Sequence, residues 1–202
     1  DRALADDEVV FTVALIALSA KMAKADGQVT DAEIRAFEEV LKVPESEKAN
    51  VNRVYRIAQQ DVAGFQAYAE QVARIYRDRP AMLEDVLDAL FHIAKADQFV
   101  HPAEIEYLRA VAEIFGLSAV EFARIRASHL GPDKSDPYLI LGITPDISTE
   151  DLRKAYRRLV RENHPDTLIA RGVPKELVDI ANEKLSTINV AYDKIMAQRG
   201  QS

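Results

Sequence analysis

The sequence predicts an all-α protein: a pseudo-symmetric N-terminal bundle of about seven helices, followed by a small C-terminal domain that contains an antiparallel helical hairpin. Apolar residues recur at steps of three and four through almost the whole chain of 202 residues, which is the period of an amphipathic helix. No segment alternates apolar and polar residues at period two, as a half-buried strand would. Glycine or proline stands where the helices should stop.

We expect the N-terminal helices at 5–25, 31–42, 46–60, 63–77, 80–96, 102–115 and 119–128, separated by Gly27, Pro44, Gly64, Pro80, Pro102, Gly116 and Gly131. The first helix contains the longest apolar run, the 12 residues from Val9 to Ala20. This run is shorter than the roughly 20 residues that span a bilayer, and three acidic residues precede it. It therefore predicts a buried core helix rather than a signal peptide or a membrane span.

An internal repeat supports the bundle. Residues 23–34 (AKADGQVTDAEI) and 94–105 (AKADQFVHPAEI) are identical at eight of 12 positions. Each copy joins the end of one predicted helix to the start of the next. The N-terminal part is therefore predicted to contain two copies of one helical unit.

The C-terminal hairpin is predicted from two apolar stripes on either side of His164-Pro165-Asp166. The first stripe consists of Leu152, Ala155, Tyr156 and Leu159, and the second of Leu177, Ala181, Leu185, Ile188, Tyr192 and Ile195. Two such helices joined by a short connection form an antiparallel pair. Because Pro165 disfavours the helical conformation at His164, the first helix should end there.

A short linker separates the two parts. The segment from Leu130 to Pro137 contains two prolines, a glycine and several polar residues, a composition typical of linkers. The predicted organisation is a helical domain at 1–131, a linker at 132–137 and a C-terminal domain at 136–202.

Four elements of the C-terminal part, in this order and spacing, resemble the J-domain. They are Asp136–Gly142 (DPYLILG), the basic helix, His164-Pro165-Asp166, and Ile188–Tyr192 (INVAY). More diffusely, residues 5–128 resemble the TerB domain, a small α-helical module. A TerB-like domain followed by a J-domain is the layout of the DjlA-type co-chaperones, which are DnaJ-like proteins.

The resemblance implies a partner, a DnaK-type chaperone. His164, Pro165 and Asp166 would engage its ATPase domain near the interdomain linker and promote ATP hydrolysis. The proline fixes its own φ, so Asp166 would be presented on a stiff connection. The alternative is a connection that only terminates a helix, with Asp166 capping locally.

A basic face on the first hairpin helix is the second candidate binding element. It consists of Arg153, Lys154, Arg157, Arg158 and Arg161. Such a face could dock an acidic surface of the partner, steering the encounter and fixing its orientation. The alternative is an ordinary solvated face, partly balanced by neighbouring carboxylates.

The remaining residues of the J-like pattern are expected to be structural. Ser148 is predicted to cap the first hairpin helix, with Asp151 three residues on. The small core is predicted to consist of Tyr138, Leu141, Leu152, Tyr156, Leu159, Ile188 and Tyr192. Two features depart from the common J-domain pattern: Thr167 stands where Lys or Arg is usual, and the segment Leu168–Val173 is longer and more apolar, although similar to the DjlA type.

Acidic residues in the repeat are weaker candidates for a metal site. They are Asp26, Asp31, Glu33, Asp97 and Glu104, whose oxygens could bind a hard cation. The calcium-loop pattern fails because Phe37 and Leu108 stand where its final Glu should be. Helix capping explains much of the pattern, with Thr30–Glu33 as a capping box and Pro102 at a first helical position. The competing function is thus a metal- or ligand-binding stress-response scaffold acting through the TerB-like domain.

Composition limits the other functions. The chain contains no cysteine, and its net charge is −7 with a pI near 5.2, which argues against bulk nucleic-acid binding. The acidity belongs to residues 1–132, with 15 Lys and Arg against 22 Asp and Glu, whereas residues 135–202 hold ten of each. No phosphate loop, nucleophile motif or metalloprotease motif is present. We expect a protein without catalytic residues or cofactor, located in the cytoplasm, or at the inner face of the membrane if a preceding segment anchors it.

Overall fold

The computed structural model describes residues 2–23, 31–46, 48–60, 64–95, 100–131 and 134–200. The regular structure of these residues is entirely helical, so the predicted all-α fold class is confirmed. All seven predicted N-terminal helices are present, with ends within a few residues of the predicted positions. Packing divides the chain into two units: residues up to Leu117 with Arg171–Leu177, and Ser118–Ala170 with the residues from Val178 onward.

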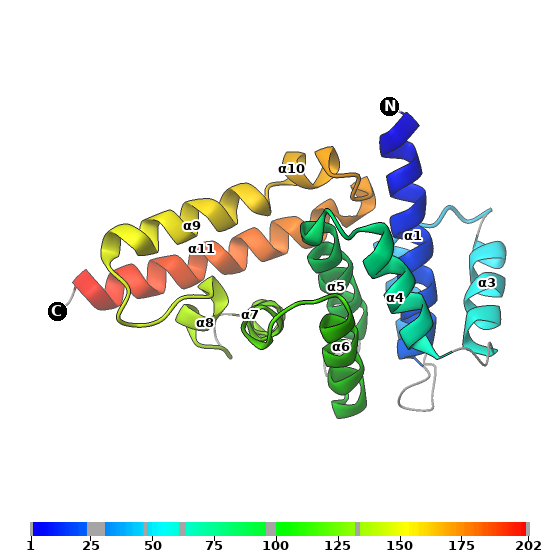
Figure 1. Cartoon of the computed structure of the whole chain (residues 1–202), viewed down its shortest axis with the longest axis horizontal. Helices are drawn as coiled ribbons and strands as arrows, with labels where there is room; N and C mark the ends of the chain where they lie inside the picture. Colours follow the sequence, from blue (N-terminus) through cyan, green and yellow to red (C-terminus); the bar gives the residue numbers. More distant parts are fainter. Residues whose placement is uncertain are drawn as a thin grey trace. The chain divides into compact units, whose positions relative to one another are not determined.

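The first unit is a bundle of helices that surround α1 and α5 (Figure 1). Its elements are α1 (Arg2–Met22), α2 (Asp31–Val40), α3 (Lys48–Gln60), α4 (Phe65–Ile75), α5 (Pro80–Ala94), α6 (Pro102–Ile114) and the short 3-10 turn Lys175–Leu177. α1 contacts α3, α4, α5 and α6, and α5 also contacts α2 and α6. Eleven of the 15 residues of α5 are buried, as expected of a helix with neighbours on most sides.

Buried polar groups fix the register of α1 in this bundle. The Tyr107 hydroxyl of α6 donates a hydrogen bond of 2.8 Å to the carbonyl of Leu18, and the Tyr55 hydroxyl of α3 donates one of 3.3 Å to the carbonyl of Ser19. Burial raises the pKa of the Tyr107 hydroxyl far above its ordinary value, because the interior disfavours the phenolate. Tyr107 therefore stays a hydrogen-bond donor throughout the range in which proteins are folded.

The apolar run Val9–Ala20 lies within α1 and contributes to the core. Phe11, Leu15 and Leu18 are fully buried in the first unit, which confirms the prediction of a buried core helix. None of the helices that the structure describes has the length and the apolar character needed to cross a bilayer.

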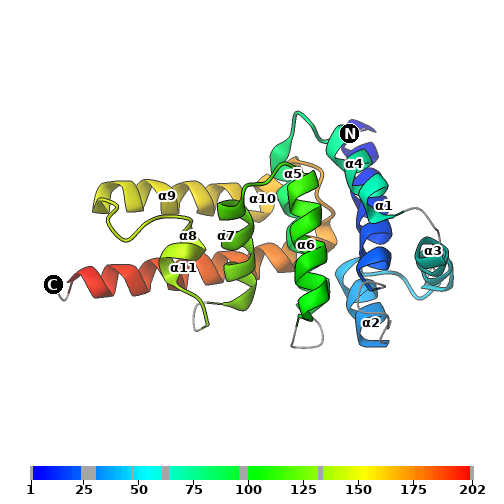
Figure 2. The same ribbon diagram turned by 60° about the horizontal axis from the view of Figure 1, so that its bottom comes forward.

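The second unit is built around the C-terminal helix α11. Its elements are α7 (Ala119–Leu130), α8 (Pro137–Leu141), α9 (Thr149–Glu162), α10 (Pro165–Ala170) and α11 (Val178–Gly200). α11 contacts each of the other four helices, and Figure 2 shows α8 beside it. Gly142 ends α8 in the left-handed conformation, with φ of 64°. This backbone conformation favours glycine, and a Cβ there would lie 2.9 Å from Cδ of Arg124, whose flexible side chain would have to move.

One hydrophobic core holds the second unit together. All seven core residues predicted from the sequence belong to it, with the three tyrosines only partly buried. The cluster consists of Ala127, Ile140, Leu141, Leu152, Leu159, Ile188, Ala191 and Ile195, with Tyr138, Ile143, Ile147, Tyr156, Val160, Tyr192 and Met196 packed against it. Through Ala127, helix α7 contributes to this core, so the boundary between the two packing units lies before α7. The domain bounds 1–131, 132–137 and 136–202 stay a prediction.

Candidate functional site

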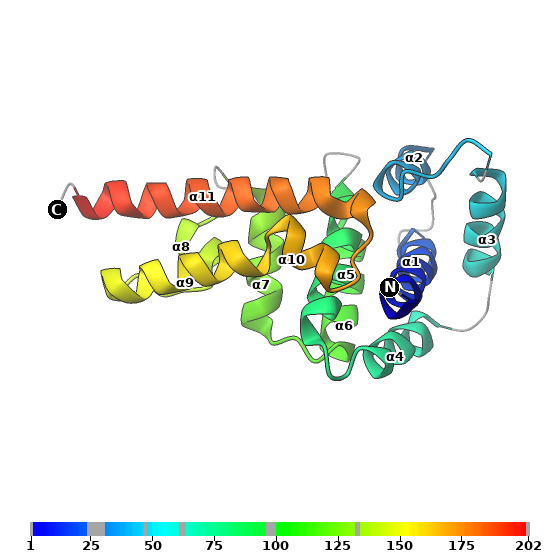
Figure 3. The same ribbon diagram turned by 90° about the horizontal axis from the view of Figure 1, so that it is seen from above.

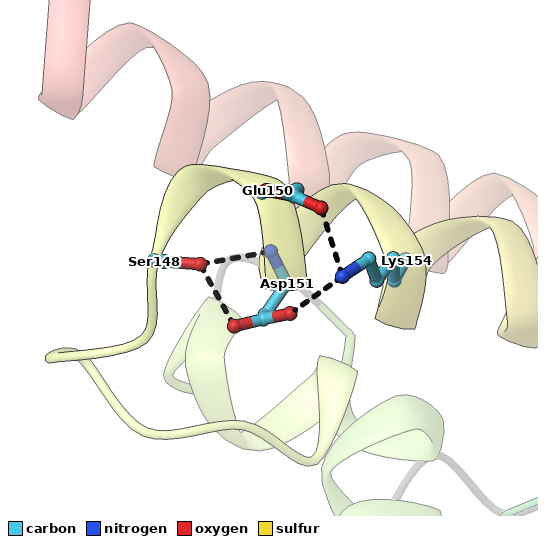
Figure 4. Close-up of polar contacts among 4 residues, drawn as sticks. All are labelled: Ser148, Glu150, Asp151 and Lys154. Carbon is cyan, nitrogen blue, oxygen red and sulfur yellow. Dashed lines mark hydrogen bonds and ion pairs between the residues drawn. The ribbon is translucent and has the colours of Figure 1, made fainter.

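Helix α9 begins with the cap that the sequence predicts (Figure 4). The Ser148 hydroxyl accepts a hydrogen bond of 3.0 Å from the Asp151 amide and donates one of 2.9 Å to Oδ2 of Asp151. Lys154 Nζ lies 3.2 Å from Oδ1 of Asp151 and 2.9 Å from Oε1 of Glu150. The first turn is therefore closed by one serine, two carboxylates and one lysine.

These contacts shift two pKa values in opposite directions. The pKa of the Asp151 carboxyl is lowered, first by the hydrogen bond from Ser148 and then by Lys154. The pKa of Lys154 is raised, first by its hydrogen bond to Glu150 and then by Asp151. Both shifts favour the charged forms. Because the folded-state pKa of Asp151 is depressed, its stabilising contribution is present above the unfolded pKa and is lost as the pH falls through the folded pKa.

Helix α9 ends at Glu162, and Asn163 caps it. The Asn163 side chain is buried and its Nδ2 donates a hydrogen bond of 2.8 Å to the carbonyl of Leu159. This satisfies one of the carbonyls left open at the end of a helix. The prediction that the first hairpin helix stops before His164 is confirmed.

His164 caps the next helix, α10, which the sequence analysis did not predict. Its Nδ1 accepts a hydrogen bond of 3.2 Å from the Asp166 amide, and its carbonyl accepts bonds from the amides of Thr167 and Leu168 at 2.9 and 3.1 Å. Pro165 stands at the first helical position, where its missing N–H costs nothing. The segment expected as a short connection thus contains the capped first turn of a helix, and the residue that caps it is His164, not Asp166.

The same contact assigns the proton of the imidazole. Since Nδ1 accepts the Asp166 N–H, it carries no proton, and the proton of the neutral ring lies on Nε2. Oδ2 of Asp166 lies 3.8 Å from Nδ1, a pair that is ionic only with a protonated ring. The Asp166 side chain is 90% exposed.

The five predicted basic residues of α9 are all exposed, but they are not equivalent. Lys154 pairs with Glu150 and Asp151, and Nε of Arg158 lies 4.0 Å from Glu162. Among the residues that the structure describes, Arg153, Arg157 and Arg161 make no such ion pair. Their spacing of four residues places these three arginines in one row along the helix. We call them the arginine row.

The opposite face of α9 packs against α11, and the two helices run antiparallel side by side (Figure 3). The rings of Tyr156 and Tyr192 stack with centroids 4.1 Å apart and an interplanar angle of 16°. The Tyr156 hydroxyl donates a 2.9 Å hydrogen bond to Oδ1 of Asn189. These contacts fix the rotation of α9 and so direct the arginine row away from the core.

Arg199 closes the far end of the hairpin. Its guanidinium donates hydrogen bonds to the Pro145 carbonyl at 3.1 Å and to the Thr149 hydroxyl at 3.4 Å, and lies over the Tyr138 ring at 5.9 Å. Sequence analysis missed Arg199 and Asn189. An Arg in the last turn of a long helix is a weak signal, because cations there are common for reasons of the helix dipole alone.

The metal candidates are not brought together in the described part of the chain. Asp26 and Asp97 lie outside the described residues, as do residues 24–30 and 96–99 of the repeat, and the side chains of Asp31 and Glu33 are not described. Glu104 is buried, and its Oε2 accepts a 2.8 Å hydrogen bond from the His101 amide in a capping box at the start of α6. No group of three His, Cys, Asp or Glu residues within the described ranges could hold a metal ion.

Comparison with known proteins matches both parts of the chain. The family "Tellurite resistance protein TerB" matches residues 12–127, and the DnaJ domain matches residues 136–199. The chain is 27% identical to a co-chaperone protein DjlA of Photobacterium profundum, over 94% of this chain and 78% of that protein. A DjlA of Escherichia coli is 23% identical, over 96% of this chain and 81% of that protein. No solved structure matches the chain.

A helical TerB domain, a DnaJ domain and an exposed His-Pro-Asp sequence after a basic helix define a J-domain co-chaperone. The similarity extends over nearly the whole chain and includes both domains in the same order. The chain belongs to the DjlA-type co-chaperones.

The cap of α9 yields a testable prediction. Replacing Ser148 by Ala removes the hydrogen bond that lowers the Asp151 pKa most, so this pKa should rise toward its ordinary value. Loss of the cap should also destabilise α9 by about 1 kcal/mol. Carboxyl-carbon NMR titration of Asp151 measures the first effect. Ser148→Thr, which keeps the hydroxyl, is the control and should retain the lowered pKa. An unchanged Asp151 pKa in Ser148→Ala would show that the hydroxyl does not cause the shift.

Proposed function

We propose that the protein binds a DnaK-type chaperone through His164-Pro165-Asp166 and the basic face of α9, and stimulates its ATPase activity. The observation that carries the proposal is the exposed carboxylate of Asp166 on the capped first turn of α10. The backbone of this turn is held by the His164 cap, so it loses little conformational freedom on binding, which favours affinity. The fold class and the DnaJ-domain match support this partner class.

The arginine row would provide the second contact. Arg161 lies next to the His164 turn, because the His164 amide donates a hydrogen bond to the Arg161 carbonyl. A row of cations without internal partners attracts an acidic surface at long range and orients it. We call the His164-Pro165-Asp166 turn the trigger. The trigger and the docking surface on α9 would thus be consecutive parts of one chain segment.

The proposal assigns no catalysis to the protein itself. His164 and Asp166 stand on the surface, and a His–Asp pair without an oriented nucleophile does not support hydrolysis. ATP would be hydrolysed by the chaperone. The proposal places the J-domain in the cytoplasm with this ATP-using partner.

Steady-state ATP hydrolysis by a purified DnaK-type chaperone tests the trigger. Asp166→Asn keeps the shape of the side chain and removes its charge, so stimulation should fall by about tenfold or more, as expected for loss of a charge-assisted hydrogen bond. His164→Gln, which removes the cap and the imidazole, should also abolish most of the stimulation. Asp193→Asn on the exposed side of α11 is the control and should match the wild type. Full stimulation by Asp166→Asn would overturn the mechanism.

A comparison of two cations on the same helix tests the docking surface. Arg157→Gln should raise the concentration for half-maximal stimulation by about two- to fivefold. Lys154→Gln should raise it less than about twofold, because Lys154 already pairs with Glu150 and Asp151. The difference should shrink at high salt. Equal effects of the two substitutions at low salt would mean that the existing ion pairs do not decide which cations bind the chaperone.

A further inference from the structure

The segment that follows α10 is fixed in the first unit by an ion pair. Asp85 lies in the buried helix α5, and its residue is only 7% exposed. Nη2 of Arg171 lies 3.4 Å from Oδ1 and 3.2 Å from Oδ2 of Asp85. Both residues belong to the first unit. A buried carboxylate is costly unless it is paired, so removing the arginine from this contact should cost more than breaking a surface ion pair.

Apolar burial strengthens the attachment. Val173 and Leu177 are buried, at 4% and 3% exposure, and Pro174 is buried between them. Gly172 has a φ of 90°, a conformation in which other residues are strained. Arg171–Leu177 therefore packs as part of the first unit, although the chain on both sides belongs to the second.

The anchored segment is covalently continuous with the trigger. Ala170, the last residue of α10, directly precedes Arg171. α10 has only six residues, far fewer than a helix needs to persist by itself in water. Its start is held by the His164 cap, and its middle by Leu168, which is 7% exposed. α10 also contacts α9 and α11, and its last residue is joined directly to the attached segment that follows.

We propose that Asp85 and Arg171 are positioning residues for the co-chaperone activity: their ion pair fixes the end of α10 and thereby keeps the His164-Pro165-Asp166 turn formed. The consequence for ATPase stimulation rests on the proposed function above; the consequence for α10 does not. Through this pair the helical bundle of the first unit contributes to the activity without touching the chaperone.

Hydrogen exchange of the full chain tests the structural part. The Thr167 and Leu168 amides, both bonded to the His164 carbonyl, report on α10. Arg171→Gln and Asp85→Asn should each accelerate their exchange by about tenfold, as expected when a local opening loses one buried ion pair. The double variant should be no faster than the faster single variant, because both changes break the same contact. Lys175→Gln, an exposed cation in the same segment, is the matched control and should leave exchange unchanged.

Folding of the variants can be kept separate from this effect. Arg171→Gln leaves a buried carboxylate without this cation, whereas Asp85→Asn removes the charge of that carboxylate and leaves Glu84 and Asp88 of α5 in place. If Arg171→Gln fails to fold, Asp85→Asn carries the test alone. Wild-type exchange at Thr167 and Leu168 in folded Asp85→Asn would overturn the proposal, and so would effects of the single variants that multiply in the double variant.

ATPase measurements test the functional part. Asp85→Asn should lower the maximal stimulation by about threefold or more and leave the half-maximal concentration unchanged, since the arginine row is intact while the trigger turn is formed less of the time. A raised half-maximal concentration with an unchanged maximum would contradict a positioning role. If the wild type gives no stimulation at all, the proposed function fails, while the exchange result still decides the role of the pair in holding α10.

Discussion

The packing of α9 against α11 is the constraint on which the rest of the second unit depends. Leu152, Tyr156 and Leu159 face this contact. Because these residues are buried or partly buried, the helical period fixes the direction in which the other side chains of α9 project. The arginine row must then face outward, and the chain must leave α9 where the apolar stripe ends. Because a rotation of α9 by one residue would bury an arginine, the same contact that stabilises the unit also fixes its binding face.

Local hydrogen bonds refine what the packing establishes. Ser148 and Asn163 close the two ends of α9, and His164 starts α10. The charges of this segment differ in their partners: Lys154 and Arg158 lie beside carboxylates, whereas the arginine row makes no ion pair among the described residues and Asp166 is 90% exposed. The family assignment names the partner class, and this division of charges supports a docking surface and a trigger of opposite sign within one stretch of chain.

The sequence predicted whatever depends on period and on local rules. The stripes of the hairpin, the Ser148 cap and Pro102 at the start of α6 follow from residues close together in the chain, and the structure confirms them. α10 was missed because histidine is not among the preferred capping residues and six residues carry no clear period. The Asp85–Arg171 pair could not be predicted, since the partners are 86 positions apart and nothing local marks them.

We propose that the chaperone binds the arginine row and the His164 turn together. Backbone amide NMR of the full chain, titrated with a DnaK-type chaperone in the presence of ATP, tests it most directly. We expect line broadening concentrated at Arg153, Arg157, Arg161 and residues 164–168, while amides of α7 and of the last turns of α11 are unaffected. Broadening confined to α1–α6, or absent from residues 164–168, would contradict it.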